Sequence, residues 1–158
     1  MTRTIIIGLG NPILSDDSVG IKVARALKDT LGDNDIDVKE LYAGGIRLVE
    51  AMEGYERAII VDAMVTGKAV PGSVCEVELS ESGDARNIAS VHDIDLPTAM
   101  KLGRSLDMDL PKEIKIFGIE IRDTNIFGEA LSAEVAGSVD IAVKAIEDYL
   151  LPVSGRIR

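Results

Sequence analysis

Hydrophobic positions along the chain follow two different patterns. Continuously apolar runs rich in β-branched residues, as at 4–8 and 57–61, are typical of strands buried on both faces of a parallel sheet. Apolar residues recurring at three- and four-residue spacing predict amphipathic helices, and 132–150 is expected to be the longest. Together the patterns predict strands at 4–8, 37–42, 57–61, 73–79 and 113–121, and helices at 18–31, 46–52, 95–105 and 132–150.

Strands that alternate with helices place the chain in the α/β class. We expect a three-layer sandwich with a mostly parallel, twisted sheet of about five strands and helices on both faces. The run at 73–79 alternates apolar and polar residues, which predicts an antiparallel edge strand with one face in water. No repeat or linker divides the sequence, so we expect a single domain over 1–158. Ligands of such sheets bind beyond the carboxyl ends of the strands.

Composition narrows the function classes. With 46% hydrophobic and 28% charged residues, the 158-residue chain can bury a core, although only 3% of it is aromatic. A net charge of −10 repels a phosphate backbone, so we expect no nucleic-acid partner. The lone Cys75 excludes an intramolecular disulfide and fits a reducing cytoplasm. The first apolar run is too short for a signal peptide or a membrane span, and we expect a cytoplasmic protein.

The glycines after the first predicted strand allow several interpretations. Gly8 and Gly10 stand where a dinucleotide-binding loop has its first glycines, but Ile13 occupies the third position and turn formers delay the helix. The segment GLGNP also resembles the opening of bacterial-type peptidyl-tRNA hydrolases. That family continues with a histidine, which is missing here, and the acidic charge disfavours a tRNA partner. A plain turn explains the glycines as well.

Three acidic residues stand at the starts and ends of predicted elements. Asp16 and Asp17 precede the helix at 18–31, where either could cap its N-terminus, although a cap needs only one. Asp62 directly follows the apolar strand at 57–61. A carboxylate there is desolvated unless it is paired, hydrogen-bonded or bound to a metal, which favours a functional role. The alternative is a hydrogen bond to its own loop.

His92 is the only histidine, and it lies in a polar loop. Such a residue is usually a plain surface residue, although histidine also serves as a metal ligand or a base. Serine-hydrolase chemistry would use it as a base, but the chain has no G-x-S-x-G motif. Cys75, inside the alternating strand, is expected to be a buried and inert thiol.

Asp17, Asp62 and His92 together offer two oxygen ligands and one nitrogen ligand from three successive loops, which we expect to lie at one edge of the sheet. Three ligands leave open coordination positions, and an imidazole favours nickel, copper or zinc over magnesium or calcium. The chain lacks the H-E-x-x-H motif and a second histidine, which disfavours a permanent zinc. The set instead suits an open site for a metal that another molecule presents.

Residues 8–27, GLGNPILSDDSVGIKVARAL, resemble the N-terminal signature of the hydrogenase maturation endopeptidases, which process the large subunit of nickel–iron hydrogenases. The resemblance continues through AGGI, IIVDAM, PGSV and VHDIDL. It implies that Asp17, Asp62 and His92 bind nickel and form the catalytic site, with Asp16 as the adjacent alternative to Asp17.

The same resemblance implies that the turn containing Gly44 and Gly45 contributes to the choice of substrate. Many relatives carry Asp before these glycines and a small hydroxyl residue after them, where this chain has Ala43 and Ile46. The implied activity removes a C-terminal extension from a nickel-loaded precursor, in a family grouped with aspartic-type peptidases. Nickel would be presented by the precursor, with no organic cofactor. A non-enzymatic, chaperone-like metal-binding module for the same precursor is the alternative. We expect a monomer.

Overall fold

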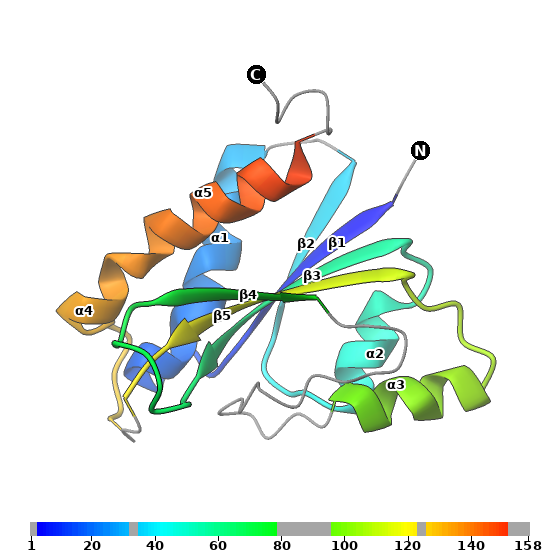
Figure 1. Cartoon of the computed structure of the whole chain (residues 1–158), viewed down its shortest axis with the longest axis horizontal. Coiled ribbons are helices and arrows are strands. Elements are labelled where there is room, and N and C mark those ends of the chain that lie inside the picture. Colours follow the sequence, from blue (N-terminus) through cyan, green and yellow to red (C-terminus); the bar gives the residue numbers. More distant parts are fainter. Residues whose placement is uncertain (1–2, 32–34, 79–95, 123–125, 152–158) are drawn as a thin grey trace.

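A computed structural model describes residues 3–31, 35–78, 96–122 and 126–151 and confirms the predicted α/β class (Figure 1). In the described part, five strands form one sheet in the order β2-β1-β3-β5-β4. The strands are β1 (Thr4–Leu9), β2 (Ile36–Leu41), β3 (Arg57–Met64), β4 (Val74–Glu78) and β5 (Glu113–Glu120). The helices are the short 3-10 helix η1 (Ser15–Ser18), α1 (Val19–Leu31), α2 (Ile46–Met52), α3 (Leu96–Ser105), α4 (Ala133–Ala136) and α5 (Ser138–Leu150).

Four of these strands are parallel, and their carboxyl ends lie at one edge of the sheet, which we call the carboxyl edge. β1 pairs in parallel with β2 and β3, and β3 pairs in parallel with β5. β4 is antiparallel to β5 at the end of the sheet, as its alternating pattern predicted. β4 therefore begins at the carboxyl edge and ends at the opposite edge, where Glu78 pairs with Lys115.

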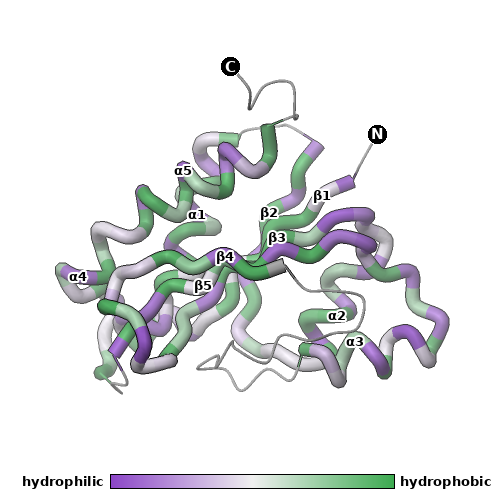
Figure 2. Tube along the Cα trace, in the orientation of Figure 1, coloured by the Kyte–Doolittle hydropathy of each residue, from purple (hydrophilic) through white to green (hydrophobic). Residues whose placement is uncertain are grey.

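Each face of the sheet buries its own aliphatic core. α1 and α5 cover one face, and α2 and α3 cover the other (Figure 1). Within β3, Ile59 and Val61 pack toward α1 and α5, whereas Ala58 and Ile60 pack toward α2 and α3. Figure 2 shows the hydrophobic positions concentrated on the central strands and mixed with hydrophilic ones along the helices. Because strand side chains alternate between faces, Asp62 belongs to the α2–α3 face.

Several element boundaries differ from the sequence prediction, and those at the last helix and at β3 differ most. The long helix expected at 132–150 is broken at Gly137 into α4 and α5, because glycine is a poor helix former. Ser132, expected inside that helix, instead precedes α4, and its hydroxyl accepts a hydrogen bond from the Val135 N–H. β3 continues to Met64, so Asp62 lies within the strand and not in the loop after it.

Tyr149, near the end of α5, packs over the amino ends of β3 and β5. The guanidinium carbon of Arg57 lies 4.4 Å from the Tyr149 ring centroid, and Lys115 Nζ lies 5.1 Å from it. The ring meets Phe117 edge to face, and its hydroxyl donates to the Glu113 carboxylate. Burial, together with the hydrogen bond to Glu113, raises the pKa of Tyr149 to about 12.

This raised pKa predicts a pH dependence of stability. The unfolded tyrosine ionises near its ordinary pKa of 10.0, while the folded one keeps its proton to about 12. The stabilisation is fully present below pH 10 and is lost as the pH rises through 12. Tyr149→Phe is therefore expected to make the fall in unfolding free energy between pH 10 and 12 shallower, as measured by urea unfolding. An equally steep fall in the variant would contradict this assignment.

Candidate functional site at the carboxyl edge

Buried acidic side chains gather at the carboxyl edge. In the described residues the buried carboxylates are Asp16, Asp17, Asp62 and Glu120, each no more than 7% exposed. Asp16 and Asp17 lie in η1 just after β1, Asp62 lies near the end of β3, and Glu120 ends β5. Because a buried carboxylate is costly unless its charge is compensated, their concentration marks this edge as the candidate site.

Glycines allow the start of α1 to contact the ends of two strands directly. A Cβ atom on Gly20 would lie 2.4 Å from the carbonyl oxygen of Val61 and 2.5 Å from that of Leu9. A Cβ atom on Gly8 would lie 2.4 Å from the carbonyl oxygen of Gly20. Gly8, which a plain turn also explains, is therefore required by close backbone packing, and so is Gly20.

This packing places the two predicted acids at the same edge of the sheet. A Cβ atom on Gly10 would lie 2.5 Å from the carbonyl oxygen of Asp17, and η1 lies against β3. Asp17 and Asp62 therefore come from neighbouring elements at the carboxyl ends of the adjacent strands β1 and β3. The structure thus places two of the three predicted metal ligands at one edge of the sheet.

Asp16 connects two segments far apart in the sequence. The Ser132 backbone N–H donates to Asp16 Oδ1 at 2.7 Å, and the Ser132 hydroxyl donates to Asp16 Oδ2 at 2.8 Å. Of the two acids predicted as possible caps of the helix, Asp16 lies inside η1, and these bonds to Ser132 give its carboxylate a different role. Its carboxylate instead fastens η1 to the loop before α4.

Asp16→Ala is expected to lower the free energy of unfolding by about 1–3 kcal/mol, because the Ser132 N–H and hydroxyl lose their acceptors. Hydrogen exchange of the Ser132 amide is expected to become faster. Urea unfolding and amide exchange measure the two effects, with Asp140→Ala on the exposed side of α5 as the control. Unchanged protection of the Ser132 amide would contradict the role of Asp16.

Glu120 is a buried acid that the sequence analysis missed. Its carboxylate accepts hydrogen bonds from the N–H groups of Thr66 and Gly67, at 2.9 and 3.3 Å, and from the Thr66 hydroxyl. It therefore holds the start of the loop after β3. The available signal was its position at the end of an apolar strand, the same signal that identified Asp62.

The turn at Gly44 and Gly45 follows β2 at the same edge, as predicted. Gly45 has φ +63°, a left-handed value that favours glycine, and its carbonyl accepts hydrogen bonds from the N–H groups of Leu48 and Val49 at the start of α2. No described atom lies within 4 Å of a Cβ built on Gly45, so open space borders this turn.

His92 and the neighbouring Asp93 and Asp95 lie outside the described residues. The strand before them does not end at the carboxyl edge, because β4 is antiparallel and ends at Glu78. Our expectation that the loop after this strand begins beside the others was therefore wrong. Within the described ranges, no three His, Cys, Asp or Glu side chains form a group that could hold a metal ion. The trio with His92 stays a prediction.

Cys75 is exposed, so the prediction of a buried thiol is wrong. The reason is the position of β4 at the end of the sheet, where β5 is its one neighbour among the described strands. Cys75 pairs with Gly118, which pairs in turn with Asp62 on β3.

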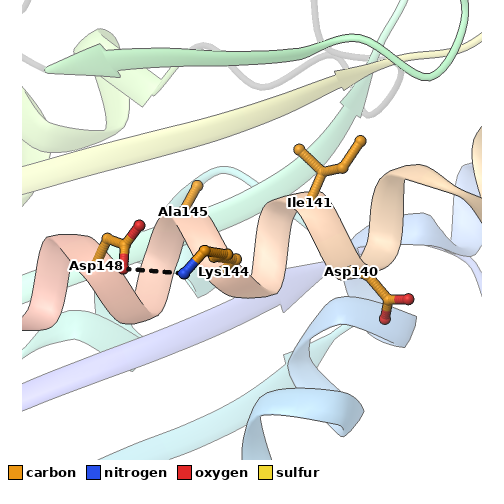
Figure 3. A pocket seen from close by; sticks show the side chains of 5 residues that line it. All are labelled: Asp140, Ile141, Lys144, Ala145 and Asp148. Atoms are coloured by element: carbon orange, nitrogen blue, oxygen red, sulfur yellow. Dashed lines mark ion pairs between the residues drawn. The ribbon is translucent and has the colours of Figure 1, made fainter.

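Two hollows lie away from the buried carboxylates of the carboxyl edge. A shallow hollow of 490 Å³ lies along the outer side of α5, where Lys144 Nζ is 3.7 Å from an Asp148 oxygen (Figure 3). Another, of 340 Å³, is lined by Tyr55, Glu56, Asp109, Leu110 and Lys112. Neither hollow contains a predicted site residue, so the candidate site is the carboxyl edge itself.

These features define an α/β protein with an acidic site at the ends of its parallel strands. Residues 21–149 match the family model of the hydrogenase maturation proteases, HycI. The chain belongs to this family, as its sequence resemblance indicated, and is accordingly a hydrolase whose family has the general role of processing the hydrogenase large subunit. No helix in the described ranges has the length and apolar character needed to cross a membrane.

Individual relatives agree with this placement. The chain is 25% identical over 119 residues to the hydrogenase 2 maturation protease of Escherichia coli strain K12. The aligned region covers 74% of this chain and 72% of the relative. The structure of the [NiFe] hydrogenase maturation protease HybD from Thermococcus kodakarensis aligns with a TM-score of 0.74 and 31% identity, over 94% of this chain and 99% of that one. The hydrogenase maturating endopeptidase HybD from E. coli aligns with a TM-score of 0.75 and 25% identity, over 94% and 91%.

Proposed function

We propose that this protein is an endopeptidase that removes the C-terminal extension of a nickel-loaded [NiFe] hydrogenase large-subunit precursor. The observation that carries the proposal is the pair of buried carboxylates, Asp17 and Asp62, at the adjacent ends of β1 and β3 in a member of this family. The lone cysteine suits a reducing cytoplasm, and we propose that a monomer acts on the precursor there.

The donor chemistry supports contact with a metal ion that arrives with the substrate. Carboxylate oxygens from Asp17 and Asp62, joined by the imidazole of His92, suit a borderline divalent ion such as nickel. Of the acidic pair, we propose Asp17 as the ligand, as the family resemblance implies, whereas Asp16 accepts hydrogen bonds from Ser132 that hold η1 to the loop before α4. A metal ion in this position acts as a Lewis acid that polarises the scissile carbonyl or activates a water.

In this proposal the side chains hold the precursor rather than share a proton as an aspartic-protease dyad does. Asp17 and Asp62 grip the metal-loaded end of the precursor, and the turn at Gly44 and Gly45 lies at the same edge to contact the neighbouring peptide. A precursor without nickel lacks the bridging ion. Cleavage therefore depends on prior metal insertion.

Incubation of the nickel-loaded precursor with the protein tests this function. The mass of the precursor is expected to fall by that of a C-terminal peptide, while the precursor without nickel keeps its full mass. An unchanged mass of the loaded precursor within an intact complex would instead favour the non-enzymatic, chaperone-like module.

A further inference from the structure

We infer that three exposed apolar side chains beside the acidic site form a docking surface for an apolar patch of the precursor protein. The three are Ile13, Ile126 and Phe127, with exposed fractions of 53%, 59% and 78%, and we call them the apolar rim. This inference rests on the proposed function and adds to it the surface that recognises the folded part of the substrate.

Phe127 is unusual for this chain. The sequence has only two phenylalanines, and the other, Phe117, is fully buried in the core between the sheet and α5. Single exposed apolar residues are common on proteins. Phe127 is largely exposed, it follows Ile126 in the sequence, and its neighbour Gly128 is hydrogen-bonded to the Ile13 backbone. An exposed phenylalanine in such a place is the kind of anchor that carries binding energy in protein interfaces.

The rim is assembled from two segments joined by hydrogen bonds. The Gly128 N–H donates to the Ile13 carbonyl at 2.8 Å, and the Ser15 N–H donates to the Gly128 carbonyl at 2.8 Å. The Ser15 hydroxyl donates to the carbonyl of Ala130 at 2.8 Å. The backbone beneath the rim is therefore fixed before a partner arrives, and less conformational entropy is lost on binding.

The rim is continuous with the acidic site. Ile13 lies three and four residues before Asp16 and Asp17, and the Asp16 carboxylate holds Ser132 at the far end of the second segment. When a segment of the substrate binds at Asp17 and Asp62, the folded part of the substrate protein therefore lies close to the rim.

Charge favours the precursor over a second copy of this chain as the occupant. Each copy carries a formal charge of −10, so pairing two copies through this edge would oppose two acidic surfaces. The rim side chains are uncharged, and they match an apolar patch beside the processed C-terminal segment of a partner.

Steady-state processing of the nickel-loaded precursor tests the rim. Phe127→Ser is expected to raise KM about tenfold or more with kcat nearly unchanged, because the anchor is lost while the acidic site is intact. Ile126→Ser is expected to raise KM as well, by less. The matched control is Ile141→Ser on the outer side of α5, since Ile141 and Ile126 have the same exposed fraction, 59%. Thermal melts establish that each variant is folded, and Ile13→Ser replaces Phe127→Ser if that variant does not fold.

If the rim variants have the same KM as the wild type and Ile141→Ser, the inference is overturned. The proposed protease function is unaffected by that result. If the wild type binds the precursor without cleaving it, the proposed function fails, and the Kd for the precursor then decides about the rim by the same comparison. Sedimentation of the protein alone is expected to show a monomer. A dimer that Phe127→Ser dissociates would overturn the inference by assigning the rim to self-association.

Discussion

Asp62→Asn is expected to reduce processing of the nickel-loaded precursor by about a hundredfold or more, the scale on which an enzyme slows when one charge-stabilising group is removed. Asparagine has nearly the shape of aspartate but no negative charge, so it keeps the packing of β3 and weakens contact with a metal ion. The measurement is the rate at which the precursor loses its C-terminal peptide, followed by mass spectrometry.

The variant is expected to stay folded. Asparagine fills the buried place of Asp62 within β3 with almost the same volume, so the unfolding free energy is expected to fall by no more than about 1–3 kcal/mol, the scale of one altered buried hydrogen bond. Asp140→Asn on the exposed side of α5 is the control; it should leave processing unchanged and lower the unfolding free energy by no more than about 1 kcal/mol, because its charge lies in the first turn of the helix. Processing at the wild-type rate in a folded Asp62→Asn protein would remove Asp62 from the site.

Most of the fold could be predicted because its elements depend on local patterns. The helix at 46–52 was predicted at its observed bounds, Ile46–Met52, since a glycine turn precedes it. The antiparallel edge strand β4 was predicted from alternation, which is the direct consequence of one face being in water. The break at Gly137 was missed, because the apolar spacing on either side of the glycine continues across it.

The site could be predicted only in part, because its contacts join residues distant in sequence. Asp17 and Asp62 were found from their places beside apolar strands. The bond from Ser132 to Asp16 spans 116 residues, and no local pattern carries that information. The antiparallel direction of β4 was predicted, yet the loop after it was expected at the same edge as the others, whereas an antiparallel strand ends at the opposite edge.

Gly20→Ala is expected to be the most destabilising of the substitutions considered. In an ordinary helix this exchange is favourable by about 0.5–1 kcal/mol. At Gly20 the new methyl would lie 2.4 and 2.5 Å from two backbone oxygens, so α1 must move away from β1 and β3. We expect the unfolding free energy to fall by about 3 kcal/mol or more, with a decrease in Tm of about 6–12 °C. Processing should fall too, since η1 and Asp17 move with α1.

Gly137→Ala provides the control, because it is the same substitution and is expected to raise the unfolding free energy instead of lowering it. Gly137 has φ −67° and ψ −20°, which alanine adopts readily, and no described atom lies within 4 Å of the position that the new methyl would take. Alanine is expected to raise the unfolding free energy by about 0.4–1 kcal/mol by restricting the unfolded chain. Urea unfolding of both variants measures the pair. A stabilising effect at both positions would mean that α1 does not press on the strand ends, and the close packing that places η1 against β3 would then be wrong.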